Sequence, residues 1–255
     1  MMASNSPLAL NLALLSAALL GFRHGFDYDH IAAITDIASV QRNPRQAMRM
    51  GLMYALGHAA TVTALGIAVI FFQLRLPQGI DNVMERVVGL TLLVLGLYVL
   101  WTTIYPRHPH THGPRTRITL LVNGVLWLVW RLRQWFSKTP VTRTQLFGDG
   151  IGKAPAFVVG IVHGIGAETT SQIMLFLLAA NLGGVGEGLL GIAMFVVGML
   201  TMNTLMCAAA AGLFRFSRRG PNTFKWVAGL SAAYSILLGL FFLAGQSAFA
   251  GVLGK

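Results

Sequence analysis

The 255-residue chain is 55% hydrophobic and only 11% charged, whereas a soluble domain carries roughly 25% charged residues. Several apolar runs reach the ~20 residues that a helix needs to cross a bilayer. This composition excludes a soluble globular domain, and the single cysteine, Cys207, excludes an intramolecular disulfide framework. The net charge of +11 would suit nucleic acid, but the basic residues cluster between apolar runs, so we expect the lipid bilayer and no nucleic acid as partner.

Hydropathy predicts an all-α integral membrane protein with six transmembrane helices, at about 8–39, 50–72, 87–105, 154–180, 188–213 and 224–245. Most basic residues follow the first, third and fifth of these spans, so those loops are expected in the cytoplasm and both termini outside. These features predict a multi-pass protein of a bacterial-type cytoplasmic (inner) membrane. The first span would be about 48 Å long as one helix, against a hydrocarbon core of about 30 Å. We therefore expect it to break where Gly21 and Gly25 flank His24.

A short internal repeat divides the chain. His24-Gly-Phe-Asp-Tyr-Asp29 in the first span matches His163-Gly-Ile-Gly-Ala-Glu168 in the fourth, and these two spans run in opposite directions. The pattern predicts two inverted three-helix repeats, at 1–105 and 154–255, with broken first and fourth spans that bind substrate near the midplane.

The linker between the two repeats, residues 106–153, is predicted to be a basic cytoplasmic loop with an interfacial helix over 118–130. Its tract of His108, His110 and His112 favours a solvated linker, with loose metal binding as the alternative.

Ionisable residues inside the apolar spans form the candidate site, because such residues are costly at bilayer depth. Helical rise places His30, His58 and His163 at similar depths. Imidazole and carboxylate ligands without thiolate suit nickel, cobalt or zinc. His24 and Asp29 lie about 140° apart on an ideal helix, so sharing one ion requires the helix to unwind. The candidate metal ligands are His24, Asp27, Asp29, His30, His58, His163 and Glu168.

Several of these polar residues also have plain structural interpretations. His58 could bond a neighbouring helix, and Asp27 could neutralise Arg23 on the same helical face. Asp36 is interpreted as an interface residue near the cytoplasmic end of its span. Gln172 and Asn203 are expected to make interhelical hydrogen bonds rather than bind metal.

Two motifs resemble those of the nickel/cobalt transporter (NiCoT) family. The stretch from Arg23 to Ile31 is similar to the family signature Arg-His-Ala-x-Asp-Ala-Asp-His-Ile, with Gly25 and Tyr28 in place of alanines. Residues 56–62, Leu-Gly-His-Ala-Ala-Thr-Val, resemble the family's Leu-Gly-His-Ser-Thr-Val. Family members commonly have eight spans, whereas six are predicted here. The resemblance implies a permease for Ni²⁺ or Co²⁺, with His24, Asp29 and His30 handling the metal and His58 contributing.

These observations predict a secondary transporter that takes up a divalent transition metal, with Ni²⁺ or Co²⁺ as transported substrate and no resident cofactor. His163 and Glu168 would complete the site or relay protons. The alternatives are a metal exporter of the same architecture, a transporter of a cationic organic solute, and a membrane acyltransferase that uses His24 as base and Asp29 to orient it. The acid-bearing motif occurs twice and no nucleophile accompanies it, so an enzyme is not expected. The oligomeric state is left open.

Overall fold

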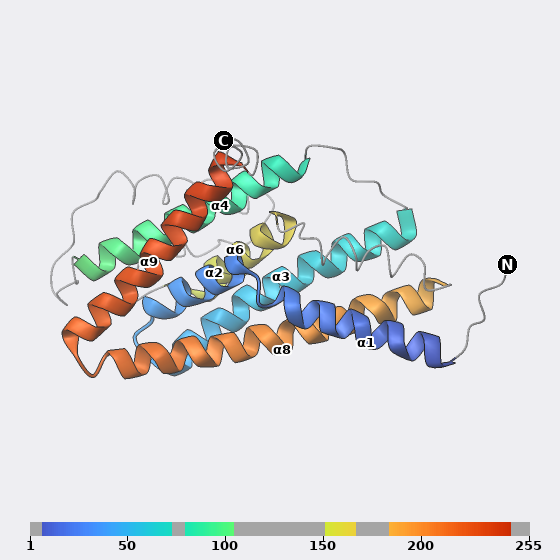
Figure 1. The fold of residues 1–255 in the computed structure, drawn as a ribbon, viewed down its shortest axis with the longest axis horizontal. Coiled ribbons are helices and arrows are strands. Elements are labelled where there is room, and N and C mark those ends of the chain that lie inside the picture. The colour runs from blue at the N-terminus through green and yellow to red at the C-terminus, as the bar shows by residue number, and fades with distance from the viewer. Residues whose placement is uncertain (1–6, 73–79, 105–150, 167–183, 246–255) are drawn as a thin grey trace, which may run out of the picture.

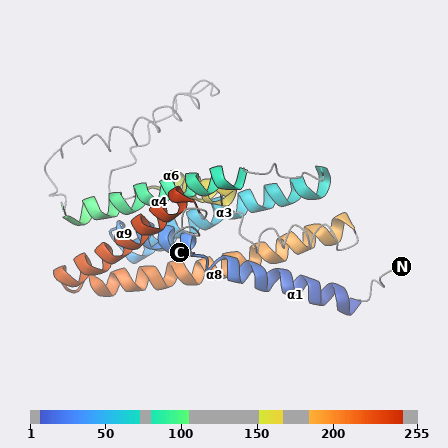
Figure 2. The same cartoon turned by 45° about the horizontal axis from the view of Figure 1, so that its top comes forward.

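The computed structural model describes residues 7–72, 80–104, 151–166 and 184–245. Within these ranges the chain is entirely helical and contains no strand, which confirms the predicted all-α class. The helices are α1 (Pro7–His24), α2 (Tyr28–Ser39), α3 (Pro44–Phe72), α4 (Ile80–Ile104), α6 (Lys153–Gly166), α8 (Val185–Ser217) and α9 (Pro221–Ala244). Figure 1 shows them as an elongated bundle, and Figure 2 shows the same bundle turned.

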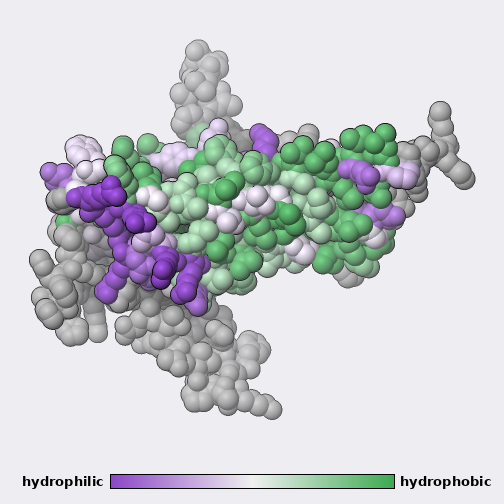
Figure 3. All heavy atoms as spheres, turned by 90° about the horizontal axis from the view of Figure 1, so that it is seen from below, coloured by the Kyte–Doolittle hydropathy of each residue, from purple (hydrophilic) through white to green (hydrophobic). Residues whose placement is uncertain are grey.

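Five helices in the described ranges are long and apolar enough to cross a membrane: α1, α3, α4, α8 and α9. The apolar helix α6 is shorter than these. Figure 3 shows apolar side chains over the middle of the bundle and hydrophilic ones gathered at the end where α8 turns into α9. This distribution suits a chain whose middle lies in lipid. The predicted second, third, fifth and sixth spans correspond to α3, α4, α8 and α9.

The first predicted span is broken at the expected place. The helix α1 ends at His24, and α2 begins at Tyr28 after the extended residue Asp27. Gly25 sits against α8, where a Cβ atom would lie 2.8 Å from the carbonyl oxygen of Met199. Because only glycine permits this approach, the sequence places the break where the chain touches α8. The break turns α2 into the bundle.

The short helix α2 lies in the middle of the bundle, with α3, α4, α8 and α9 around it. Most of its residues are buried, including the polar residues Asp29, His30 and Asp36. Its apolar residues pack into the main hydrophobic cluster with α3, α4, α8 and α9. The helix that carries Asp29 and His30 of the signature motif is therefore largely shielded from lipid.

Glycine allows close contacts in three helix pairs: α1 with α8, α3 with α6, and α4 with α9. A Cβ on Gly21 would collide with the backbone of Phe195, and one on Gly160 would collide with the backbone of Tyr54. Gly89 and Gly239 face each other's carbonyl oxygens. Small residues let membrane helices approach until dispersion contacts and polar groups hold them together. These closely packed helix pairs surround the site.

The linker predictions lie mostly outside the described residues, including the interfacial helix at 118–130 and the histidine tract of the 106–153 loop. The continuation of the fourth span beyond Gly166 also lies outside them, as does Glu168.

Candidate metal site

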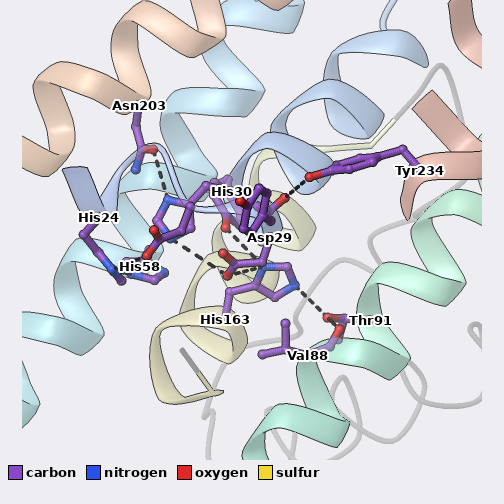
Figure 4. Close-up of polar contacts among 12 residues, drawn as sticks. His24, Asp29, His30, His58, Val88, Thr91, His163, Asn203 and Tyr234 are labelled. Carbon is purple, nitrogen blue, oxygen red and sulfur yellow. Dashed lines mark hydrogen bonds and ion pairs between the residues drawn. The ribbon is translucent and has the colours of Figure 1, made fainter. Parts of the chain in front are cut away.

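Three buried histidines meet where the first span breaks. His24 is the last residue of α1, His30 lies in the first turn of α2, and His58 lies in the middle of α3. All three side chains are fully buried. The Nε2 atoms of His24 and His58 are 3.0 Å apart, and one nitrogen from each ring lies within 4.8 Å of the other two. Figure 4 shows the rings turned toward one another.

Polar partners behind two of the rings orient them. The Nδ1 atom of His24 lies 3.0 Å from Oδ2 of Asp27, and Nδ1 of His30 lies 3.1 Å from Oδ1 of Asn203 on α8. Carboxylate and amide oxygens only accept hydrogen bonds. The amide oxygen therefore favours a proton on Nδ1 of His30, which leaves its Nε2 lone pair facing the cluster, and the carboxylate of Asp27 lies where it can hold His24 in the same way. Metal-binding histidines are typically oriented in this way by a second partner.

Several buried polar atoms around the cluster have no hydrogen-bond partner in the described structure, and two of them face each other: Nε2 of His30 and Oδ2 of Asp29. They lie 4.0 Å apart. Buried polar atoms without partners are uncommon and costly. A cation that bound both atoms would remove that cost, so the arrangement is suited to a metal held by imidazole nitrogen and carboxylate oxygen.

His163 occupies a different position beside Asp29. Its Nδ1 atom lies 4.0 Å from Oδ2 of Asp29 and 3.1 Å from the hydroxyl of Tyr54. Its Nε2 atom lies 2.7 Å from the hydroxyl of Thr91 on α4. Both nitrogens therefore have hydroxyl partners, and His163 contacts the acidic side of the cluster rather than completing its ring of nitrogens (Figure 4).

The structure brings six of the seven predicted site residues together. The exception is Glu168, which lies outside the described residues. Depth counted along straight helices grouped His30, His58 and His163, and the structure places His24 with His30 and His58 as well, while His163 lies beside Asp29. The break folds the end of α1 back beside α2, which a straight-helix estimate of depth cannot include. Asp27 contacts His24, although the sequence also allowed it a role in neutralising Arg23.

Three residues around the site were missed as functional residues. Asn203 carried one signal, an amide within an apolar run, but was assigned only an interhelical hydrogen bond. Tyr54 and Thr91 carried none, because a hydroxyl in an apolar helix is ordinary. Their role becomes visible only in the structure, where the hydroxyl of each lies within hydrogen-bond distance of a ring nitrogen of His163.

Comparisons with known proteins agree with the motifs. The profile described as "High-affinity nickel-transport protein" (NicO) matches residues 10–108. The urease accessory protein UreH of Bacillus sp. (strain TB-90) is 23% identical over 74% of this chain and 73% of its own length. The cobalt transport protein NhlF of Rhodococcus rhodochrous is 26% identical over 88% and 66%, respectively. The nickel transporter NicT of Mycobacterium tuberculosis is 25% identical over 88% and 64%.

The chain spans just under two thirds of the length of those two transporters. No solved structure matches it. The two motifs, the matched profile and the named relatives agree in showing that this chain is similar, at low identity, to nickel and cobalt transport proteins.

Proposed function

We propose that this protein is a membrane permease that takes up Ni²⁺ or Co²⁺ through the cluster of His24, His30 and His58. The observation that carries the proposal is the convergence of three buried imidazoles beside the unpartnered oxygen of Asp29. Similarity to a cobalt and a nickel transporter supports the same substrates. The relatives are named as transporters or accessory proteins, and we assign no enzymatic activity.

The donor atoms favour a borderline transition metal. The cluster offers neutral imidazole nitrogens and one carboxylate, a set that suits nickel, cobalt and zinc, whereas calcium and magnesium prefer oxygen ligands. The only cysteine, Cys207, faces Gly51 instead of the cluster. Metal must compete with protons for imidazole, so affinity is expected to fall in acid.

The contacts of the glycine-framed histidines support two inverted three-helix repeats. His24 lies between Gly21 and Gly25, and His163 lies between Gly160 and Gly164 in the same spacing. The first pair of glycines packs against the backbone at two α8 residues one turn apart, and the second pair does the same on α3. The contacted residues are Phe195 and Met199 on α8, and Tyr54 and His58 on α3. We therefore propose that α1 and α6 are equivalent helices, as are α3 and α8.

The orientation follows from charge. Exposed basic residues lie at one end of the bundle, on the α2–α3 and α8–α9 connections, and we propose that this end faces the cytoplasm with the termini outside. Inward movement of a cation would then gain about 2.3 kcal/mol per charge per 100 mV of membrane potential. In this arrangement the metal passes from the cluster along α2 toward the basic end. A role for Glu168 in completing the site remains a prediction.

The test is accumulation of radioactive nickel and cobalt in cells that express the wild type, His24→Ala or an empty vector. Ser16→Ala, an exposed position on the same helix, is the matched control. We expect accumulation by the wild type and the control alone. Equal accumulation by His24→Ala would assign the cluster a structural role, and accumulation below the empty vector would indicate export.

A further inference from the structure

A second buried carboxylate, Asp36, lies two helical turns beyond Asp29 on α2, where α2 packs against α9. Its side chain is fully buried. The Ser231 hydroxyl of α9 donates a 2.8 Å hydrogen bond to Oδ1 of Asp36. Ser235, one turn further along α9, faces the same carboxylate, but its hydroxyl makes no hydrogen bond of normal geometry. The other oxygen, Oδ2, has no hydrogen-bond partner in the described structure.

No cation neutralises this carboxylate within the described ranges. His58 and Tyr54 on α3 face His30, two turns away from Asp36, and Tyr234 on α9 bonds the carbonyl of Tyr28. At the end of α2, Arg218 donates its hydrogen bonds to the backbone carbonyls of Ser39, Gln41 and Arg42. The remaining basic side chains on the described parts of the helices that pack against α2, and on the α8–α9 connection, are exposed: Arg45, Arg49, Arg86, Arg215, Arg219 and Lys225.

The surroundings of Asp36 suit a proton better than a transition metal. They offer carboxylate and hydroxyl oxygens but no nitrogen or sulfur ligand, whereas nickel and cobalt sites use imidazole. An ionised carboxylate buried without a cation is expensive. A protonated carboxyl is neutral, and its O–H on Oδ2 can donate to a neighbouring hydroxyl such as that of Ser235. Protonation therefore resolves both the uncompensated charge and the unsatisfied oxygen.

We propose that Asp36 is a proton-binding site and that its loading and release are coupled to the movement of metal through the histidine cluster. This inference rests on the proposed transport function. The neutral carboxyl lets α2 pack against α9, while release of the proton to water leaves a charge that draws water into this interface. Because α2 also carries Asp29 and His30, a change in its packing on α9 reaches the metal site through one short helix. Two packings with different affinities for metal and proton are sufficient for coupling.

The test uses purified protein in liposomes, with a metal-sensitive dye and a pH-sensitive dye enclosed. Ni²⁺ is added outside, and both signals are followed for the wild type and Asp36→Asn. The asparagine keeps an oxygen that accepts the Ser231 hydrogen bond but cannot take up a proton. Thr35→Ala, the neighbouring residue whose hydroxyl bonds only its own helix, is the matched control. Isothermal titration with Ni²⁺ checks that each variant retains the histidine cluster.

We expect metal entry to change the lumenal pH in the wild type and the control, and Asp36→Asn to bind Ni²⁺ normally but lose the pH signal. A pH signal in Asp36→Asn equal to that of the wild type, or none in the wild type while metal enters, would overturn the proposal. Dependence of the wild-type metal flux on sodium instead of pH would replace the proton with Na⁺ and also overturn it. Absence of any metal entry would instead contradict the transport function.

If Asp36→Asn does not fold, Ser231→Ala provides the test. Removing the hydroxyl that donates to Oδ1 of Asp36 disfavours the ionised carboxylate, so the pH at which flux is half-maximal should rise. An unchanged pH profile would contradict the proposal.

Discussion

His24 and His163 occupy similar backbone settings but have different partners. Each is framed by glycines at the same spacing, and each frame packs closely on a neighbouring helix, α8 in one case and α3 in the other. The Nδ1 atom of His24 faces the carboxylate of Asp27, and its Nε2 faces His58. Both nitrogens of His163 face hydroxyls, those of Tyr54 and Thr91.

The difference shows that the flanking glycines position a histidine, whereas its hydrogen-bonding partners determine whether the ring has a lone pair free for a metal. A carboxylate accepts the proton of one nitrogen and leaves the other with a lone pair for a metal. Hydroxyls both donate and accept, so the ring between Tyr54 and Thr91 is satisfied without an ion. On this basis we propose that His24 is a metal ligand and that His163 is a positioning residue beside Asp29.

The largest effect is expected from His30→Ala. Loss of a whole ligand should weaken Ni²⁺ binding by more than the roughly 10–100-fold that supporting residues contribute. Isothermal titration of the purified protein measures this, with Thr35→Ala on the same helix as control. Unchanged affinity would remove His30 from the site and with it the assignment of roles to the two framed histidines.

Glycine substitutions should test whether the two frames are equivalent. A Cβ on Gly21 or Gly160 would strike the backbone of the opposing helix, so Gly21→Ala and Gly160→Ala should each cost about 1–3 kcal/mol of stability. Gly229 on α9 faces open space, and Gly229→Ala is the matched control that should be neutral or stabilising. Thermal unfolding in detergent, monitored by tryptophan fluorescence, gives the comparison. A loss of stability in only one of the two variants would show that the glycine pairs around His24 and His163 are not equivalent.

The supporting residues should have intermediate effects. Asn203→Ala removes the acceptor that holds the proton of His30 on Nδ1, and Asp27→Asn removes the carboxylate behind His24. Each should weaken Ni²⁺ binding by about 10–100-fold. Thr204→Val is the control on α8, since its hydroxyl bonds the carbonyl of Leu200 on the same helix. Wild-type affinity in both test variants would mean that orientation of the rings contributes little.

The smallest effect on affinity is expected from His163→Gln. Glutamine can still bond the hydroxyl of Thr91, and the three-nitrogen cluster stays intact, so Ni²⁺ binding should weaken by less than about tenfold, the lower limit for a supporting residue. Isothermal titration of both His163→Gln and His30→Ala with Ni²⁺ allows the two affinities to be compared directly. A loss as large as that of His30→Ala would make His163 a ligand and reverse the contrast with His24.

Much of the fold and part of the site could be predicted from sequence. Apolar run lengths predicted the helices, because the hydrocarbon core sets the length of a span. The break followed from the length of the first run and the position of Gly25. The motif singled out His24, Asp29 and His30, since charged and imidazole side chains are rare within apolar runs.

Only the tertiary structure decided which of these residues meet. The break folds His24 back toward His30 and His58, which depth counted along straight helices cannot show. Asn203 became a partner of His30 because α8 passes beside α2. Asp36, interpreted from sequence as an interface residue, is fully buried against serines of α9. Hydropathy determines how deep a residue lies in the membrane. Helix packing determines which side chains are in contact there. Those contacts in turn determine the hydrogen bonds and the protonation of each ring and carboxyl group.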